Sequence, residues 1–377
     1  MTRTPFAIPA IPLLLASVLA GCAASPAQRE PDETDAAPML AANAIAHVTV
    51  AEAFVTPLTP DDNVDSPASW VDRDGRVVLI ATAKKSGRLK LYNGDTGAAT
   101  GNQGSRGAAA GQFDRPNGLF VIDDLVFVVE RDNHRVQVLR LPSFAPLGHF
   151  GDVDLAQPYG LWLRSTAPGA YDVLVSDAYM AGTDARGDDV VPPLAALGAR
   201  FKRYQVTVGA AGVVATRQAD IGDTTVEGAI RIPESLWGDA AHARLLVAEE
   251  DIATGTALRE YGLDGRFRGR TLGLGLFKAQ AEGIALWACA DGSGYWIATD
   301  QFKDRSLFHV FDRVTLAHLG AFAGNTVANT DGIWLQQSAT ARFPAGVFYA
   351  VHDDMGVGAF DWRDVARGLG LRERCTR

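Results

Sequence analysis

The chain has 377 residues, of which 47% are hydrophobic and 21% are charged, and its formal net charge is −9. This composition is typical of a globular protein and excludes a disordered or fibrous chain, and apart from the leading segment no apolar run is long enough to span a bilayer. The acidic balance without a basic block argues against nucleic-acid binding, and three cysteines are too few for a disulfide-stapled scaffold or a cysteine-rich zinc module.

Residues 1–21 have the features of an export signal, because an apolar stretch is followed by a Leu-Ala-Gly-Cys run that ends at Cys22. This run resembles a bacterial lipobox, in which the cysteine is acylated and becomes the mature N-terminus. We therefore expect a lipoprotein anchored through Cys22 in the cell envelope, with Ala23 favouring the outer membrane. An ordinary cleaved signal peptide is the alternative. Residues 22–43 are rich in Ala, Pro, Asp and Glu and are expected to form a flexible tether.

From residue 44 to residue 377 the chain repeats one unit six times. Each unit begins with a small turn and an apolar strand, continues through a Gly/Asp-rich turn into a second apolar strand, and adds a third strand of alternating pattern. Such repeats predict one propeller blade each, so we expect an all-β, six-bladed β-propeller. A β-sandwich is the alternative. The positions that most units fill with glycine are Pro67, Gly118, Gly160, Gly228, Gly283 and Gly332.

Three further features lie outside the repeat. Residues 47–58 alternate in polarity and are expected to complete the last blade, which would close the ring. Residues 180–198 are an insertion between the third and fourth units, expected to be a mobile loop. Cys289 lies in an apolar run and is expected to be a buried small hydrophobe, whereas Cys375 at the tail has no assigned role.

The residues that open the innermost strands are expected to converge on one end of the channel, because those strands surround it in a propeller. Four of them are acidic, and carboxylates that share one axis repel one another unless cations or protons neutralise them. An oxygen-rich site of this kind suits Ca²⁺. The alternative is that each is a turn residue with local hydrogen bonds. The six residues are Asp65, Asn117, Tyr159, Glu227, Glu282 and Asp331.

The loops that follow the second strands are expected at the same end of the channel. Basic residues gather in the first two units, at Lys84, Lys85 and Arg131, and acidic residues in the last three, around Glu250 and Gln301. Cations held by acids beside a wall of Lys and Arg suit a polyanion such as a phosphate ester. A set of solvated hairpin loops is the alternative.

In the order and spacing of these segments the chain resembles the β-propeller phytase family. The matching stretches include residues 65–70, 84–87, 248–251 and 290–295. The resemblance covers most of the chain after Cys22 and implies a six-bladed propeller with Ca²⁺ at the channel mouth. It also implies the activity of a 3-phytase, which releases phosphate from phytate (myo-inositol hexakisphosphate) by in-line attack of a metal-bound water.

The resemblance carries residue roles with it. Lys84, Lys85, Arg131 and Tyr159 would bind substrate phosphate, and Glu227 would join Lys84, Arg131 and Tyr159 as a catalytic residue. The phosphorylated small molecule would be the main partner of a monomeric protein that touches the membrane only through its lipid. The calcium ligands that the resemblance implies are Asp65, Glu227, Glu250, Glu282, Gln301 and Asp331.

The chain also departs from the family pattern. Ser66 follows Asp65 where the family has paired aspartates, and Gln280 and Asn329 replace acids. The second unit, over residues 113–138, is more similar to an NHL-type repeat. A lipid-anchored propeller that binds a ligand without catalysis is therefore an alternative, as is another metal-dependent propeller hydrolase.

Overall fold

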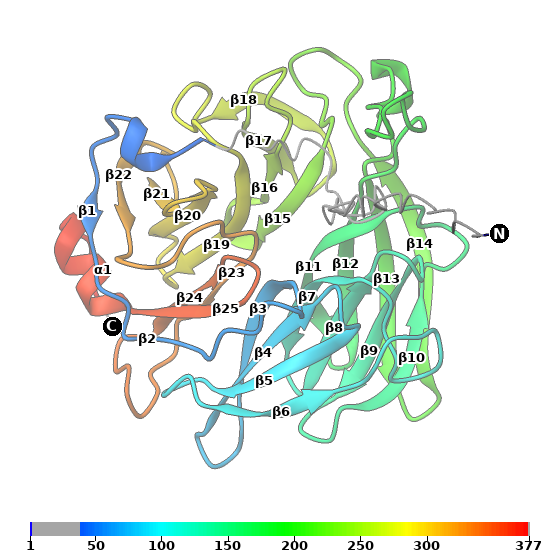
Figure 1. Ribbon diagram of the computed structural model, residues 1–377, viewed down its shortest axis with the longest axis horizontal. Coiled ribbons are helices and arrows are strands. Elements are labelled where there is room, and N and C mark those ends of the chain that lie inside the picture. Colours follow the sequence, from blue (N-terminus) through cyan, green and yellow to red (C-terminus); the bar gives the residue numbers. More distant parts are fainter. Residues whose placement is uncertain (2–37, 376–377) are drawn as a thin grey trace.

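The computed structural model describes Met1 and residues 38–375, so the rest of the predicted signal peptide and the predicted lipid anchor at Cys22 lie outside the described residues. Six small sheets stand in a ring around a central channel (Figure 1). The chain is thus a six-bladed β-propeller, as the repeat predicts. Within the described part of the chain, no helix has the length and apolar character needed to cross a membrane.

Each blade is a sheet of four antiparallel strands whose first strand lies nearest the channel, except that blade 6 takes its fourth strand from the N-terminus and blade 5 adds a short parallel strand. Blade 1 contains β3 (Val64–Val71), β4 (Val77–Ala83), β5 (Arg88–Asn93) and β6 (Ala99–Gln103), and blade 2 contains β7 (Pro116–Ile122), β8 (Leu125–Glu130), β9 (Arg135–Arg140) and β10 (Ala145–Phe150). Blade 3 contains β11 (Pro158–Ala167), β12 (Ala170–Asp177), β13 (Phe201–Gly209) and β14 (Gly212–Ile221), and blade 4 contains β15 (Pro233–Asp239), β16 (Arg244–Glu249), β17 (Ala257–Gly262) and β18 (Phe267–Leu272).

The last two blades include the N-terminal strands. Blade 5 contains β19 (Ala281–Ala288), β20 (Gly294–Asp300), β21 (Leu307–Asp312), β22 (His318–Ala323) and β1 (Val48–Thr49), and blade 6 contains β23 (Ile333–Gln336), β24 (Val347–His352), β25 (Gly356–Asp361) and β2 (Phe54–Val55). The short helical elements are α1 (Trp362–Leu369) and the 3₁₀ turns η2 (Leu40–Ala42), η3 (Leu194–Ala196) and η4 (Ala240–His242).

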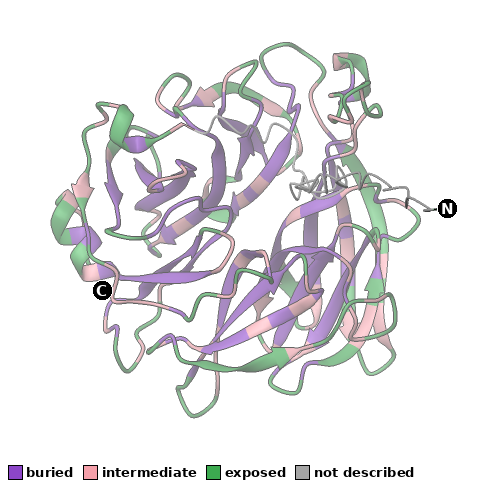
Figure 2. Cartoon of the chain, viewed as in Figure 1, coloured by how far each residue is buried: buried purple, intermediate pink, exposed green. Residues whose placement is uncertain are grey.

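Burial within a blade follows the hydrophobic pattern of its strands. Every residue of the second strands β8 and β16 is buried, because these apolar runs are covered on both faces by neighbouring blades. The outermost strand β6 is mostly exposed. Figure 2 shows this gradient from the buried centre of the ring to its exposed rim.

The N-terminal strand β2 closes the ring, as predicted for residues 47–58. Phe54 pairs with Ala359 of β25 in antiparallel register. Strand β1 instead adds to blade 5, where Val48 lies beside Phe322 in a parallel pair. The prediction of a flexible tether is wrong for its last residues, because Leu40 is buried and its N–H donates to the Asp304 carboxylate at 2.6 Å.

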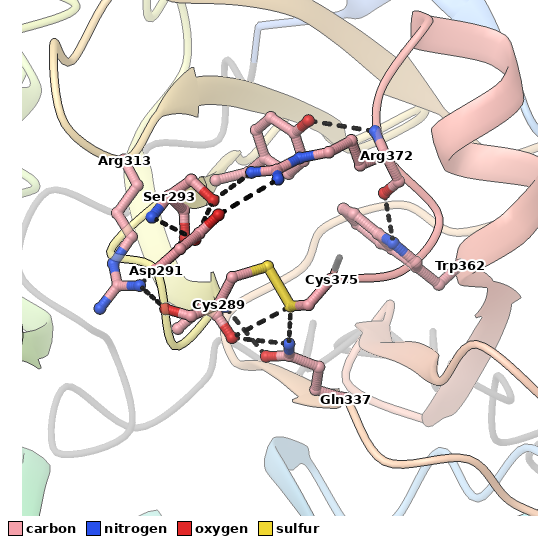
Figure 3. Close-up of a disulfide and its surroundings, with 10 residues drawn as sticks. Cys289, Asp291, Ser293, Arg313, Gln337, Trp362, Arg372 and Cys375 are labelled. Atoms are coloured by element: carbon pink, nitrogen blue, oxygen red, sulfur yellow. Dashed lines mark hydrogen bonds and ion pairs between the residues drawn. A yellow bond between two sulfur atoms is a disulfide. The ribbon is translucent and has the colours of Figure 1, made fainter. Parts of the chain in front are cut away.

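The C-terminal segment is fixed to blade 5 by a disulfide between Cys289 and Cys375 (Figure 3). The interpretation of Cys289 as an unpaired small hydrophobe is therefore wrong. The two residues are 86 positions apart in the chain, and the ring brings their Cα atoms to 5.5 Å. Beside the disulfide, Trp362 of α1 stacks on Trp287 of β19 with ring centroids 5.6 Å apart.

The insertion over residues 180–198 folds partly into a hairpin of its own. The N–H of Ala181 donates to the Val190 carbonyl, and the N–H of Val190 donates to the Gly182 carbonyl. This hairpin projects from the ring beside blade 3 (Figure 1, green).

Three aromatic side chains meet in the channel, one from each of blades 2, 4 and 6. The ring centroids of Phe120, Trp237 and Trp334 lie 5.2–5.6 Å from one another. The rings and several glycine positions line a cavity of about 40 Å³. Because all three rings touch, we conclude that they close the channel on the side away from the site described next.

Candidate functional site

One side chain from each blade gathers at the mouth of the channel. In five blades this residue lies within a β-bulge, where the pairing of the first and second strands shifts register. A bulge redirects the side chains of its strand, which explains why these residues leave the sheet surface and face the mouth. Each is at least nine-tenths buried. The six are Asp65, Asn117, Tyr159, Glu234, Glu282 and Asp331.

The small residue that follows each of these six is required by the packing of the inner strands. A Cβ atom on Gly160 would lie 2.7 Å from the Glu234 carbonyl oxygen, and one on Gly283 would lie 2.7 Å from the Asp331 carbonyl oxygen. The repeated glycine therefore marks the close approach of neighbouring blades, and it positions the preceding residue at the mouth.

The predicted place of Glu227 in this ring is wrong. Strand β15 begins at Pro233, so Glu234 occupies the position, while Glu227 is exposed in a turn. The Val-Glu-Gly run at 226–228 has the residue pattern of the repeat, but the run that opens the inner strand is Pro-Glu-Ser at 233–235. Ser66 fills the same position after Asp65 in blade 1, and this was the signal that could have identified Glu234.

The residues that follow the second strands form an outer set around the mouth. The N–H of Lys84 donates to the Asn63 carbonyl at 2.8 Å, and Glu250 and Gln301 make the equivalent bonds to Ile232 and Gln280 in their own blades. The same backbone bond joins Arg131 to Arg115 at 3.1 Å. The structure therefore brings the predicted residues Lys84, Arg131, Glu250 and Gln301 to the same end of the propeller.

A pocket of about 30 Å³ lies between the two sets of residues. This volume accommodates a bound ion or about two water molecules. Blade 2 contributes no residue to its lining. The lining residues are Asn63, Lys84, Tyr159, Glu234, Glu250, Gln280, Glu282, Gln301, Asn329, Asp331 and Asp354.

Lys84 is the basic residue of this lining, and it is already paired with buried acids. Its Nζ lies 2.8 Å from Asp65 Oδ2 and 3.7 Å from Asp331 Oδ2. The Tyr159 hydroxyl donates to the same Asp65 oxygen at 3.4 Å. Lys84 is 5% exposed and Asp65 fully buried, so the pair forms part of the inner wall of the mouth.

The remaining acids of the pocket repel one another. Burial raises the pKa of Glu282 well above its usual range, and Glu250, Glu234 and Asp331 raise it further by their negative charge. Among the described residues, no side chain or backbone group hydrogen-bonds the Glu282 carboxyl, although it is 3% exposed. The charge of the Lys303 ammonium opposes this rise in pKa, so this carboxyl faces the pocket with a cation nearby but without a hydrogen-bond partner among the described residues.

The buried carboxyl groups of Asp331 and Glu250 each have partners that offset part of the cost of burial. Burial raises the pKa of Asp331 well above its usual range, and the Lys84 ammonium opposes this effect. The Gln301 amide donates to Asp331, and the Gln280 amide donates to Glu250 Oε1 at 2.7 Å. These two amides therefore give Asp331 and Glu250 a neutral hydrogen-bond donor each.

Two predicted substrate-binding residues lie away from the pocket lining. Lys85 is exposed, and its carbonyl accepts a hydrogen bond from Arg106 at 2.6 Å. Arg131 bonds Asp132 through its Nε at 2.8 Å and does not line the pocket. Their predicted roles in binding phosphate stay predictions.

The donor chemistry of the mouth fits Ca²⁺, because carboxylate and amide oxygens dominate the lining and one carboxyl lacks a partner. The arrangement is not a finished ligand shell. In the part of the chain that the structure describes, no three His, Cys, Asp or Glu side chains are grouped so that they hold a metal ion. Calcium binding would therefore require Lys84 or the glutamine amides to give way.

Comparison with known proteins extends only to the fold. No family model and no curated protein matches the chain. Similar solved structures include a nidogen/laminin complex (11% identity, 71% of this chain and 82% of that chain, TM-score 0.45). Others are hydrazine synthase from Kuenenia stuttgartiensis (11%, 82% and 75%, TM-score 0.42) and the calcium-binding protein regucalcin from Agrobacterium tumefaciens (13%, 84% and 95%, TM-score 0.49).

Proposed function

We propose that the channel mouth is a calcium-dependent site for a phosphorylated small molecule, and that the protein is a phosphomonoesterase for which phytate is the reference substrate. One observation carries this proposal. Glu234, Glu250, Glu282 and Asp331 line one small pocket, and the single ammonium group among its described lining residues, on Lys84, is already paired with Asp65. The Lys303 ammonium acts on Glu282 and Asp331 from outside this lining, so the four acids still outnumber the cations. An excess of buried carboxylates is costly unless a cation joins them.

The chemistry of a bound calcium ion would complement these residues. Glu250, Glu282 and Asp331 would hold the ion, with the Gln301 amide oxygen as a neutral ligand. When bound, Ca²⁺ cancels the charge of the carboxylates and attracts the oxygens of a phosphate group. The unpartnered Glu282 carboxyl would lose its proton to the solvent as the metal binds.

The neighbouring blades supply positive charge for an anionic ligand. Lys84 of blade 1 lies in the pocket wall, and Arg115, two residues before Asn117 in blade 2, is buried but does not line the pocket. A phosphoryl group spreads its negative charge over several oxygens, which such cations stabilise. Tyr159 holds Asp65 and thereby helps orient the Lys84 ammonium.

We further propose that the protein is exported and held at the membrane through lipid on Cys22. The Cys289–Cys375 disulfide supports export, because disulfides form and persist in oxidising compartments. Labelling of the expressed protein with a palmitate analogue, compared with Cys22→Ser, would test the anchor. Equal label in both would refute it.

Phosphate release from phytate tests the enzyme proposal. The purified protein would be assayed with about 1 mM CaCl₂ and with chelator, alongside Glu282→Gln and the exposed control Lys85→Ala. We expect calcium-dependent release by the wild-type protein and by Lys85→Ala, and at least about a hundredfold loss in Glu282→Gln. Calcium should also raise the Tm of the wild-type protein but not that of Glu282→Gln.

The outcomes separate the two main alternatives. If the protein binds phytate in a calcium-dependent way but releases no phosphate, it is a binding propeller and not a phosphatase. A Tm that does not respond to calcium would show that the acidic mouth is not a metal site, and the proposal would then fail entirely.

A further inference from the structure

Four blades use the last residue of the second strand as an acidic clasp. Its carboxylate accepts backbone N–H groups of the segment that leads into the inner strand of the same blade. In blade 3, Asp177 accepts from Ala156 and Gln157, and in blade 5, Asp300 accepts from Lys278 at 3.0 Å and Ala279 at 2.7 Å. Glu130 and Glu249 act in the same way in blades 2 and 4.

In blades 2, 3 and 5 the third strand places a partner side chain beside the clasp. In blade 2, Gln137 donates to Glu130 at 2.8 Å and Arg135 pairs with it at 2.9 Å. In blade 3 the Lys202 Nζ lies 3.7 Å from Asp177. Blade 5 has His309 in this place, with Nε2 3.5 Å from Asp300 Oδ2. Among these partners, only a histidine changes its charge near neutral pH.

The hydrogen bonds that the His309 ring can make depend on whether the ring is neutral or charged. It is fully buried, and its Nε2 makes no hydrogen bond although Asp300 is near. Its Nδ1 lies 3.1 Å from Nε2 of His318 on β22. A charged His309 would donate to Asp300 through Nε2 and to His318 through Nδ1, which satisfies both nitrogens. A neutral ring carries one proton and can donate to only one of them.

The surroundings of His309 contain few other charges. The charged or titratable groups that the described residues place against it are Asp300 of β20 and His318 of β22. Its other close neighbours are the rings of Phe277 and Phe311. Partial burial and the charge of a protonated His309 lower the pKa of His318, which favours the neutral form that can accept a hydrogen bond from His309.

The clasp lies directly beside the candidate site. Lys278 and Ala279, which Asp300 holds, immediately precede the pocket residues Gln280 and Glu282. Any loosening of Asp300 would therefore loosen the segment that presents the unpartnered carboxyl.

We propose that His309 is a pH-dependent positioning residue, whose charged form locks Asp300 onto the 278–279 segment and so orders the mouth on the side of blade 5. Loss of this charge as pH rises leaves Asp300 without a cationic partner. The link to ligand binding rests on the proposed function, but the locking of the segment does not.

Hydrogen exchange measures the clasp directly and needs neither calcium nor substrate. The protection of the 278–279 amides would be compared with that of the 156–157 amides, which the lysine-partnered clasp of blade 3 holds. Between about pH 8 and about pH 6, relative protection of the blade 5 amides should rise about tenfold in the wild-type protein. His309→Gln, which places an uncharged amide beside Asp300 as Gln137 lies beside Glu130, should abolish this rise.

A second variant and a second measurement distinguish failure of the His309 proposal from failure of the proposed calcium site. His318→Leu removes the acceptor at the exposed edge, and we expect it to shift the rise to lower pH. The proposal would be overturned if the protection of the 278–279 amides relative to the 156–157 amides did not change with pH in the wild-type protein. It would also be overturned if His309→Gln showed the same change as the wild-type protein. The ratio of calcium affinities of the wild-type protein and His309→Gln should be larger at about pH 6 than at about pH 8. If neither protein binds calcium while the exchange result holds, the proposed function fails and the clasp stands.

Discussion

Replacement of Lys84 tests whether this residue is a buried counter-ion or a free ligand for phosphate. Lys84→Met removes the ammonium 2.8 Å from Asp65 Oδ2 and leaves a fully buried carboxylate. Loss of one partner from a buried pair costs about 3–5 kcal/mol. Asp65 keeps hydrogen bonds from Ser66 and Tyr159, so we expect the lower end, about 3 kcal/mol.

A double-mutant cycle isolates the interaction. Asp65→Asn alone leaves Lys84 near Asp331, at 3.7 Å, and should cost only about 1 kcal/mol. The double variant should return to within about 1 kcal/mol of the wild-type protein, since the Lys84–Asp65 pair is removed as a whole and Asp331 keeps the hydrogen bond from the Gln301 amide. The coupling energy would then be about 3 kcal/mol.

Urea unfolding with chelator present, followed by tryptophan fluorescence, gives the four stabilities. Lys85→Met is the matched control and should change stability by less than about 0.5 kcal/mol, because Lys85 is exposed. If Lys84→Met is as stable as this control, the reasoning is refuted and Lys84 is available to a ligand in the resting protein.

Three more outcomes follow from the structure. Cys375→Ser should lower the unfolding free energy by up to about 4–5 kcal/mol, because the bond closes a loop of 86 positions, and a loss below about 1 kcal/mol would contradict this. Burial raises the pKa of Glu249 to about 7, so its ionisation should weaken the fold as pH rises from about 4.5 to about 7, and the stability difference between the wild-type protein and Glu249→Gln should change only in that window. Gly160→Ala should lower the unfolding free energy by about 2 kcal/mol, because it forces a Cβ atom to 2.7 Å from the Glu234 carbonyl oxygen. Gly209→Ala is the control and should cost far less, because the space around Gly209 is open. Equal shifts in Tm for the two variants would count against close packing of the inner strands.

The sixfold repeat was sufficient to predict the propeller and five of the six residues that the inner strands place at the mouth. These five are Asp65, Asn117, Tyr159, Glu282 and Asp331, and a glycine or another small residue follows each of them. A repeat pattern records such close approaches because neighbouring backbones leave no room for a side chain. A residue that directly precedes such a small residue at the start of an inner strand therefore lies at the mouth.

The errors arose where a local pattern competed with the three-dimensional arrangement. Glu227 precedes a glycine, but the clasp from Glu249 to Arg231 and Ile232 fixes the strand start farther on, at Pro233. The sequence also could not show that Lys84 lies 3.7 Å from Asp331, because that contact depends on how blades 1 and 6 meet. The disulfide was missed because it depends on how the segment after α1 packs against blade 5.

The aromatic closure formed by Phe120, Trp237 and Trp334 makes the channel a blind well with one entrance. A ligand that enters at the acidic mouth has to leave by the same route, so reactant and product cannot pass through the ring in sequence. If the protein hydrolyses a phosphate ester, released phosphate would compete directly with the next substrate molecule. The two tryptophans beneath the mouth would also give an intrinsic fluorescence signal of its occupancy.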